Sequence, residues 1–313
     1  MTTRSYRTVV LGNFDGIHKG HQELIRLGRQ IADANHEELA VFTFYPQIQQ
    51  IRDPKFCYLL GEKQKLERFR ELQVDIVETV PFEEQVASLS PEAFVQNILV
   101  DRLCARHIVV GFNYSFGYKG AGNPELLTEL AKAHGIEVHV MEPFLMDGEL
   151  VCSTAIRQAL KDGDVEKANR LLGYTYSIEG PVVHGNQIGR TIGFPTANIR
   201  PEDNIMLPGN GVYAALTTVD GTVYPGILNI GLRPTIEHST GVNIEVNLFG
   251  FDADIYGKTI RTELYYFLRS ERKFNGLDAL KAQLQQDREQ TLKLFSEVFC
   301  RSGIFSELIL EKP

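Results

Sequence analysis

Two hydrophobic patterns follow one another along the chain. Up to about residue 165, short apolar runs alternate with segments whose apolar positions recur at helical spacing. The apolar runs are 9–11, 39–44, 75–80, 107–112 and 136–141, and the helical segments are 18–34, 62–72, 91–103 and 124–134. Repetition of strand, helix and strand predicts right-handed crossovers and a parallel sheet covered on both faces. In such a sheet, ligands bind beyond the carboxyl ends of the strands.

After about residue 175 the pattern changes to paired and alternating strands. Residues 212–219 and 222–230 flank Asp220-Gly221, a dipeptide suited to a tight hairpin turn. Residues 243–249 alternate strictly between apolar and polar positions, and 259–268 form another apolar run. The final helical stripe consists of Leu277, Leu280, Leu284, Leu292 and Phe295. This half is predicted to be a small antiparallel barrel with a closing helix.

The two patterns indicate two domains, which the length of 313 residues also favours. We place the first domain at 1–165 and the second at 177–300, joined by a largely helical connector at 166–176. Residues 301–313 form a tail to which the sequence assigns no role.

Charge and cysteine content narrow the class of partner. The chain carries 40 acidic and 32 basic residues, a net charge of -8, which argues against a broad surface for nucleic acid or an anionic membrane. Small phosphorylated ligands need only a local site. The four cysteines form no C-x-x-C pair, and no apolar run approaches the roughly 20 residues that span a bilayer. We therefore expect a cytosolic protein without a membrane partner.

The stretch "GNFDGIHKGH" follows the first apolar run and opens the first helix. His18 and His21 stand three residues apart, about 300° around a helix, so they share a face. A helix start collects anions, and imidazole N–H groups there can donate to phosphate oxygens. Taken alone, the pair could also be surface residues at a helix start. A zinc site is a further alternative, although no third ligand stands nearby in the sequence.

A second stretch, "VCSTAIR", lies near the end of the first domain. Ser153 and Thr154 can cap a helix and bind phosphate, and Arg157 can donate two hydrogen bonds to a leaving pyrophosphate. An ordinary helix cap is the simpler interpretation of these residues when they are considered alone.

The second domain carries "GPVVHGNQIGRTIGFPTANI" at residues 180–199. Its glycines could wrap a phosphate chain, and Thr196 and Asn198 offer two oxygens to a hard cation such as Mg²⁺. Glu245 stands on the polar side of its strand, where a carboxylate could reach into a barrel mouth and act as a general base. A polar hairpin loop and an exposed strand glutamate are the simpler alternatives.

The first two stretches resemble the paired signatures of the nucleotidylyltransferase superfamily. "TFYP" (residues 43–46) and "VVGFNYSFGYKGAG" (109–122) resemble the branch found in bacterial FAD synthases. The resemblance implies catalytic roles for His18, His21 and Arg157. It implies ATP contacts at Gly12, Asn13, Phe14, Asp15, Gly16, Gly20, Ser153 and Thr154. Flavin contacts are implied at Phe44, Pro46, Asn113, Tyr114 and Phe116.

The second domain resembles riboflavin kinases through "GRTIGFPTAN", "GVYA", "NIGLRPT", "IEVNL", "DIYG" and "LRSERKF", in family order. That family is a six-stranded barrel. The resemblance implies ATP contacts at Gly185, Gly189, Arg190, Gly193, Pro195, Thr196 and Asn198. It implies Mg²⁺ at Thr196 and Asn198, flavin at Asn229 and Arg269, and Glu245 as the base.

The whole chain therefore resembles the bacterial bifunctional riboflavin kinase/FAD synthase family. The expected fold is a Rossmann-like α/β nucleotidylyltransferase domain followed by a six-stranded antiparallel barrel with a closing helix. The implied enzyme phosphorylates riboflavin to FMN and then adenylylates FMN to FAD, with ATP as donor and ADP and pyrophosphate as by-products.

The first domain departs from the family pattern at three positions. Asn113 replaces the usual Asp, Gly120 stands where many members carry Arg, and Cys152 replaces a Ser. An alternative is therefore a riboflavin kinase with a weak or silent adenylyltransferase half. A flavin-responsive regulatory protein is a second alternative from a different class.

Overall fold

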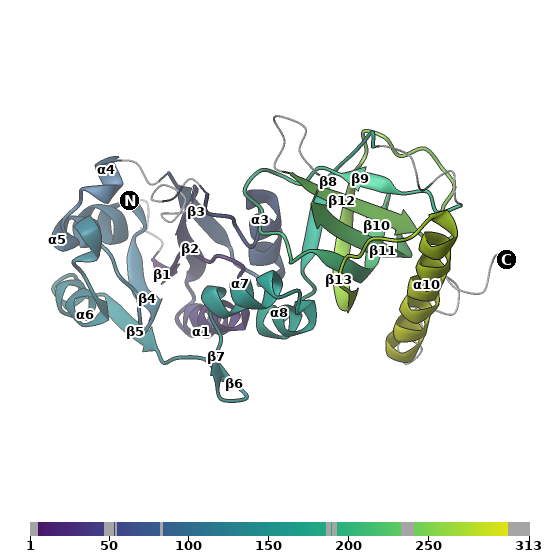
Figure 1. The fold of residues 1–313 in the computed structure, drawn as a ribbon. Helices are drawn as coiled ribbons and strands as arrows, with labels where there is room; N and C mark the ends of the chain where they lie inside the picture. The colour runs from purple at the N-terminus through teal and green to yellow at the C-terminus, as the bar shows by residue number, and fades with distance from the viewer. Residues whose placement is uncertain are drawn as a thin grey trace. The chain divides into compact units, whose positions relative to one another are not determined.

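The computed structural model describes residues 6–46, 53, 55–81, 84–185, 189, 193–232 and 241–299. The chain divides into two compact units, Met1–Ala155 and Ile156–Pro313, and Figure 1 draws the elements of each. The division falls within one helix, α7 (Ser153–Lys161). Across the described ranges, no helix combines the length and the apolar character needed to cross a bilayer.

The first unit is built on a five-stranded parallel sheet with the strand order β3-β2-β1-β4-β5. Its strands are β1 (Arg7–Leu11), β2 (Glu38–Phe44), β3 (Ile76–Val80), β4 (Ala105–Gly111) and β5 (Glu137–Met141). The strand order reverses between β1 and β4, which is where open α/β sheets bind ligands. The stretch "GNFDGIHKGH" leaves β1 at this point, so the predicted parallel sheet brings it to the expected edge.

Helices connect these strands and cover the sheet. They are α1 (Lys19–Asn35), α3 (Glu62–Glu71), α4 (Glu84–Ala87), α5 (Pro91–Phe94), the π-helix η1 (Val95–Arg102), the 3-10 turn η2 (Tyr118–Gly120) and α6 (Pro124–Lys132). Ser90 caps α5 by accepting from the Ala93 N–H, and Pro91 holds the first helical position, as the sequence predicts. A short hairpin, β6 (Leu145–Met146) and β7 (Glu149–Leu150), precedes α7.

Alternating apolar side chains give the parallel sheet two buried faces. On one face, Phe42 packs in a cluster with Leu99 of η1 and Leu127 of α6. The other face carries α1, where a Cβ added to Gly28 would lie 2.5 Å from Cγ2 of Val10. This close approach requires glycine, and the two faces together form the core of the unit.

The second unit contains a closed barrel with the strand order β10-β11-β12-β9-β8-β13. Its strands are β8 (Ser177–Val183), β9 (Ala197–Ile199), β10 (Gly211–Val219), β11 (Thr222–Leu232), β12 (Val242–Leu248) and β13 (Thr259–Arg269). The larger part of α7 and helices α8 (Val165–Leu172) and α10 (Leu277–Phe299) complete it. The predicted six-stranded barrel with a closing helix is confirmed, although periodicity alone did not identify β8 and β9.

Helix α10 fixes which strand face points outward. Ala214 and Leu216 of β10 pack with Phe295 of α10, while Ile227 of β11 belongs to a cluster that Leu292 joins. The alternate positions face the barrel interior, where the buried hydroxyls of Thr217 and Thr262 lie 3.0 Å apart. Because β10 pairs with β11, and β11 with β12, without a register shift, the position of a residue along these three strands shows which face it belongs to. Strand β13 shifts its register against β10 at two places.

Candidate active sites

The first candidate site is the turn that follows β1. Backbone φ angles of 51° at Phe14, 82° at Gly16 and 36° at Ile17 place three nearby residues in the left-handed region. Such backbone strain is concentrated at functional sites. The Phe14 ring is buried and packs edge-on against Phe69, and it lies 3.1 Å from where a Cβ on Gly12 would stand. A glycine at position 12 therefore makes room for this ring.

His18 caps the helix that the turn leads into. Its Nδ1 accepts a hydrogen bond of 3.3 Å from the backbone N–H of His21. The two imidazole rings are stacked, with centroids 3.7 Å apart. Because Nδ1 of His18 accepts, a neutral His18 ring carries its hydrogen on Nε2, which is then available as a donor.

Burial keeps both histidines neutral. It lowers the pKa of His18 to about 4, and it lowers the pKa of His21 well below its usual value, with further contributions from His18 and Lys65. Nδ1 of His21 is buried without a hydrogen-bond partner among the described residues. The site thus presents imidazoles in the form that donates from one nitrogen only, in an environment with little water.

The second sequence stretch closes onto the first through one hydrogen bond. The hydroxyl of Ser153, at the start of α7, donates to the backbone carbonyl of Asp15 over 2.9 Å. The buried carboxylate of Asp15 accepts from the Leu59 N–H over 3.0 Å. Thr154 is exposed at the same helix start, and Arg157 follows Ser153 by about one helical turn. Residues far apart in the sequence therefore meet at the turn after β1.

The residues implied for flavin contact differ in exposure. Phe116 is 5% exposed and belongs to the hydrophobic core, whereas Phe44 and Tyr114 are partly buried and pack against it. Tyr114 stacks on Phe116 with ring centroids 6.0 Å apart, and burial raises the pKa of its hydroxyl. Asn113 is exposed beyond the end of β4. The structure gives Phe116 a packing role, so a planar ligand would contact the other residues of this set.

Pro46 and Gly120 complete this edge of the first unit. Pro46 follows the end of β2, and Gly120 is exposed with a φ of 71° in η2. Cys152 is half-buried immediately before α7.

The second candidate site is a row of three polar side chains across the barrel wall. Asn198 of β9 pairs with Glu245 of β12, and Glu245 pairs with Asn229 of β11. Paired residues point to the same side of a sheet. Since Asn229 pairs with Val212 and shares the face of Ile227, this row lies on the outer face, the one that α10 packs against.

The expectation that Glu245 reaches into the barrel mouth is therefore wrong. Strict alternation predicts that Glu245 and Val246 point to opposite sides, but only barrel closure decides which side is inside. Val246 is completely buried in the interior, while Glu245 is half-buried on the outside. Nδ2 of Asn243 donates to Oε1 of Glu245 over 2.8 Å, which holds the carboxylate in place.

A cavity of about 500 Å³ opens on the inner side of the same strands. Pro195 and Thr196 line it together with Val246 and with Asp254 and Tyr256 of the following loop. Nδ2 of the buried Asn247 donates to the Pro195 carbonyl over 2.7 Å and fixes this rim. Thr196 of the Pro-Thr-Ala-Asn segment lies at this rim, and two residues further along the chain Asn198 stands in the polar row beside Glu245.

The glycine-rich segment before β9 lies only partly within the described residues. A Cβ on Gly185 would stand 2.2 Å from Nδ2 of Asn198, which places Gly185 directly beside the polar row. Gly189 lies beside the Phe194 carbonyl, and Gly193 is exposed. Arg190 lies outside the described residues, so its predicted phosphate contact stays a prediction.

Comparisons with known proteins identify a family for each unit. Residues 2–155 match the FAD synthetase family, and residues 172–295 match the riboflavin kinase family. The bifunctional riboflavin kinase/FMN adenylyltransferase of Listeria monocytogenes is 41% identical over 93% of each chain. The protein of the same name from Bacillus subtilis is 38% identical, again over 93% of each chain. The chain belongs to the bifunctional riboflavin kinase/FMN adenylyltransferase family.

A solved structure extends this likeness to the fold. A crystal structure named as a macrolide-efflux protein from Streptococcus pneumoniae aligns with a TM-score of 0.85 and 34% identity, covering 93% of this chain and 95% of that one. Membership of the flavin-synthesising family rests on the two matched domains and the curated relatives. The predicted fold class, family and class of transferase are confirmed.

Sequence reasoning missed two buried charged residues that contact predicted site residues. Lys65 of α3 is 4% exposed, and its Nζ donates to the Asn13 carbonyl over 2.7 Å and to Oγ1 of Thr43 over 2.9 Å. Burial lowers its pKa to about 8. Lys65 thus ties the turn after β1 to the end of β2.

The other missed residue is Asp287 of α10, which is 1% exposed. Nε and an Nη of Arg269 donate to its carboxylate over 2.8 to 3.0 Å. This forked ion pair ties α10 to the end of β13. Arg269, predicted near flavin and phosphate, therefore positions the helix that packs on β10 and β11.

Acidification is expected to weaken the first unit through His18. An unfolded histidine titrates near pH 6.5 and the folded His18 near pH 4, so between these values only the unfolded chain takes up the proton. Neutral His18 therefore makes its full contribution to the free energy of unfolding above pH 6.5. As the pH falls from 6.5 towards 4, this contribution decreases by about 3 kcal/mol. Urea unfolding of wild type and His18→Asn across this range measures the difference. An equal fall in both proteins would contradict it.

Proposed function

We propose that the barrel unit transfers the γ-phosphoryl group of ATP to the 5′-hydroxyl of riboflavin, and that the parallel-sheet unit then adenylylates the FMN formed. The row of Asn198, Glu245 and Asn229 supports the kinase half. The hydrogen bond from Ser153 to Asp15, which joins both nucleotidylyltransferase signatures, supports the second half.

In the kinase step, Glu245 is the general base. Its carboxylate accepts the proton of the 5′-hydroxyl as the hydroxyl oxygen attacks the γ-phosphorus, and ADP leaves. Asn243 orients the carboxylate through the hydrogen bond of 2.8 Å. Asn229, the neighbour of Glu245 on β11, is placed to hydrogen-bond the flavin, while Thr196 and Asn198 on the other side face the nucleotide.

Mg²⁺ fits the donor set of the barrel unit. The Thr196 hydroxyl and the Asn198 amide oxygen are hard oxygen ligands, and Glu245 adds a carboxylate in the adjacent register position. Thr196 and Asn198 would hold the ion, which when bound supplies charge neutralisation for the ATP phosphates. Two neutral ligands leave most of the coordination sphere to phosphates and water, as Mg²⁺ prefers.

In the adenylylation step, an FMN phosphate oxygen attacks the α-phosphorus of a second ATP and pyrophosphate leaves. Nε2–H of His18 and the N–H of His21 donate to phosphate oxygens whose charge rises during the displacement. Ser153 and Lys65 hold the turn in shape through the carbonyls of Asp15 and Asn13. Arg157 receives the leaving pyrophosphate.

The proposed setting is the cytosol, with riboflavin, FMN, FAD, ATP, ADP and pyrophosphate as partners. Cys57, Cys104 and Cys152 form no disulfide within the described part of the chain, in keeping with a reducing compartment. The net charge of -8 supports the exclusion of nucleic acid as a partner.

A product assay tests both halves. The protein is incubated with riboflavin, ATP and Mg²⁺, or with FMN in place of riboflavin, and the flavins are separated by chromatography. FMN followed by FAD is expected in the first reaction and FAD in the second. FMN without FAD, even from supplied FMN, would show that the departures at Asn113, Gly120 and Cys152 silence the second half. No product in either reaction would contradict both enzyme assignments.

A further inference from the structure

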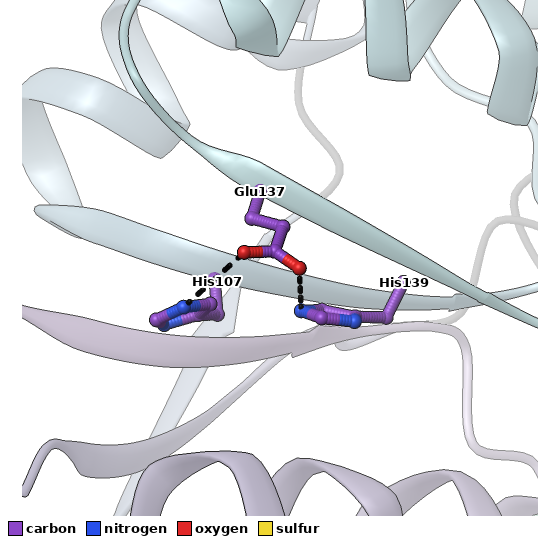
Figure 2. Close-up of side chains that lie close together, drawn as sticks. All are labelled: His107, Glu137 and His139. Carbon is purple, nitrogen blue, oxygen red and sulfur yellow. Dashed lines mark ion pairs between the residues drawn. The ribbon is translucent and has the colours of Figure 1, made fainter. Parts of the chain in front are cut away.

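Two histidines and a glutamate gather on the first unit, outside both candidate sites. His107 of β4 pairs with Glu137 of the edge strand β5, and His139 follows two residues later opposite Val109. The three side chains therefore point to the same face of the sheet (Figure 2). It is the face that carries α1, because a Cβ on Gly28 of that helix would lie 3.9 Å from Val109.

The side-chain atoms lie close to the spacing of a metal site. Nε2 of His107 is 3.9 Å from one carboxylate oxygen of Glu137, and Nε2 of His139 is 3.6 Å from the other. One ligand atom from each residue lies within 4.8 Å of the other two. Tetrahedral zinc with bonds of about 2.0 to 2.2 Å separates its ligand atoms by about 3.4 Å. A shift of well under 1 Å for each side chain would close the site.

A buried carboxylate behind His107 prepares the ring for metal binding. Oε2 of Glu37 lies 2.9 Å from Nδ1 of His107 and also accepts from the Thr8 hydroxyl over 2.7 Å. With Nδ1 donating its hydrogen to Glu37, the Nε2 lone pair of His107 faces Glu137. Metal-binding histidines are commonly oriented by a carboxylate in this way, which fixes the tautomer and makes the free nitrogen more basic.

His139 supplies an independent sign that a ligand is missing. Its Nε2 is buried without a hydrogen-bond partner among the described residues, although Glu137 lies nearby. A buried ring nitrogen without a partner is costly, and a metal ion would satisfy it.

We infer that His107, Glu137 and His139 form a binding site for a divalent transition-metal ion of the zinc class, with Glu37 as the residue that orients His107. Two imidazoles and one carboxylate suit such an ion better than Mg²⁺, which prefers oxygen ligands alone. The Glu137 side chain is 68% exposed, so water or a solvent ligand takes the fourth position.

This site is separate from the proposed chemistry. His107 precedes Gly111, at the carboxyl end of β4, by four residues, which is about 13 Å along the strand. The bound ion would link β4 to the edge strand β5 and stabilise that edge of the sheet. Zinc would therefore raise the stability of the first unit without taking part in either transfer.

Titration of the full-length protein with ZnCl₂ tests the inference. The protein is first treated with EDTA, dialysed free of it, and studied by isothermal calorimetry without ATP or Mg²⁺. We expect a binding step of one zinc ion per chain that His139→Gln abolishes and Glu37→Gln weakens about 10- to 100-fold. Co²⁺ at the same site should give the visible absorption of a tetrahedral complex.

The matched control is His134→Gln, which alters an exposed histidine outside the cluster in the same unit. It should bind zinc like the wild type. Flavin synthesis by metal-free His139→Gln should equal that of the wild type, which shows that the variant folds. Wild type without zinc binding would overturn the inference. So would unchanged affinity in His139→Gln, which would place the ion elsewhere, for example at His18 and His21.

Discussion

A Glu245→Gln variant is expected to lose FMN formation while it still converts supplied FMN to FAD. Glutamine keeps the size of the side chain and an oxygen that can accept from Asn243, but its amide does not accept the proton of the riboflavin hydroxyl. Loss of a general base lowers the turnover rate about 10²- to 10⁴-fold. The effect should fall on kcat more than on KM, since substrate binding does not require the proton transfer.

Separate assays with riboflavin and with FMN measure the two activities of this variant. Glu263→Gln is the matched control, because Glu263 is a half-buried glutamate in β13 whose neighbour Thr262 faces the interior, so it also points outward. It should leave both rates within about twofold of the wild type, an effect of a few tenths of a kcal/mol. A similar loss in both variants, or a parallel loss of FAD formation, would mean that Glu245 supports the fold and is not the base.

The parallel sheet and the barrel could be predicted from the sequence because their patterns are local. The run 39–44 is apolar at every position except Thr43, as is typical of a strand buried on both faces, and β2 forms there. Strands β8 and β9 were not predicted from periodicity. Strand β9 has only three residues and follows a glycine-rich segment. Their strand character comes from pairing with β12 and β13, which local periodicity does not show.

Residues of the candidate sites could be predicted only where a sequence motif marks them. Asn198, Glu245 and Asn229 were identified separately, but their common row depends on the register of three strands. Lys65 stands in the polar segment "EKQKLERFRE" and reads as a solvated helix residue. Its burial follows from where α3 packs, which depends on tertiary contacts.

For Phe116 the motif and the position in the fold indicate different roles. An aromatic residue in a flavin-binding motif suggests a ligand contact, yet this ring fills the core beside Phe94. Sequence alone does not distinguish an aromatic residue that binds a ligand from one that packs, because both are apolar and flanked by glycine. Exposure decides between them, and it is a property of the fold.

The second large effect is expected at His18. His18→Asn should lower the rate of FAD formation from FMN about 10²- to 10³-fold, the range for removal of one hydrogen-bond donor from a developing charge. Asparagine is among the best helix caps, so its side chain can accept from the His21 N–H and α1 can still begin at Lys19. What the variant lacks is the donor on Nε2.

His36→Asn is the control for this variant, because His36 ends the same helix with a φ of 56° that asparagine tolerates. It should retain both activities. His21→Ala should also lose FAD formation and keep FMN formation, but it removes a ring that packs against Phe14, so part of its effect would come from the turn. The asparagine variant helps to separate these contributions, since it keeps the cap and the Phe14–His21 contact but lacks the imidazole Nε2–H. If His18→Asn formed FAD at the wild-type rate, His18 would serve only to begin the helix. If either histidine variant also lost FMN formation, the two reactions would not have separate sites.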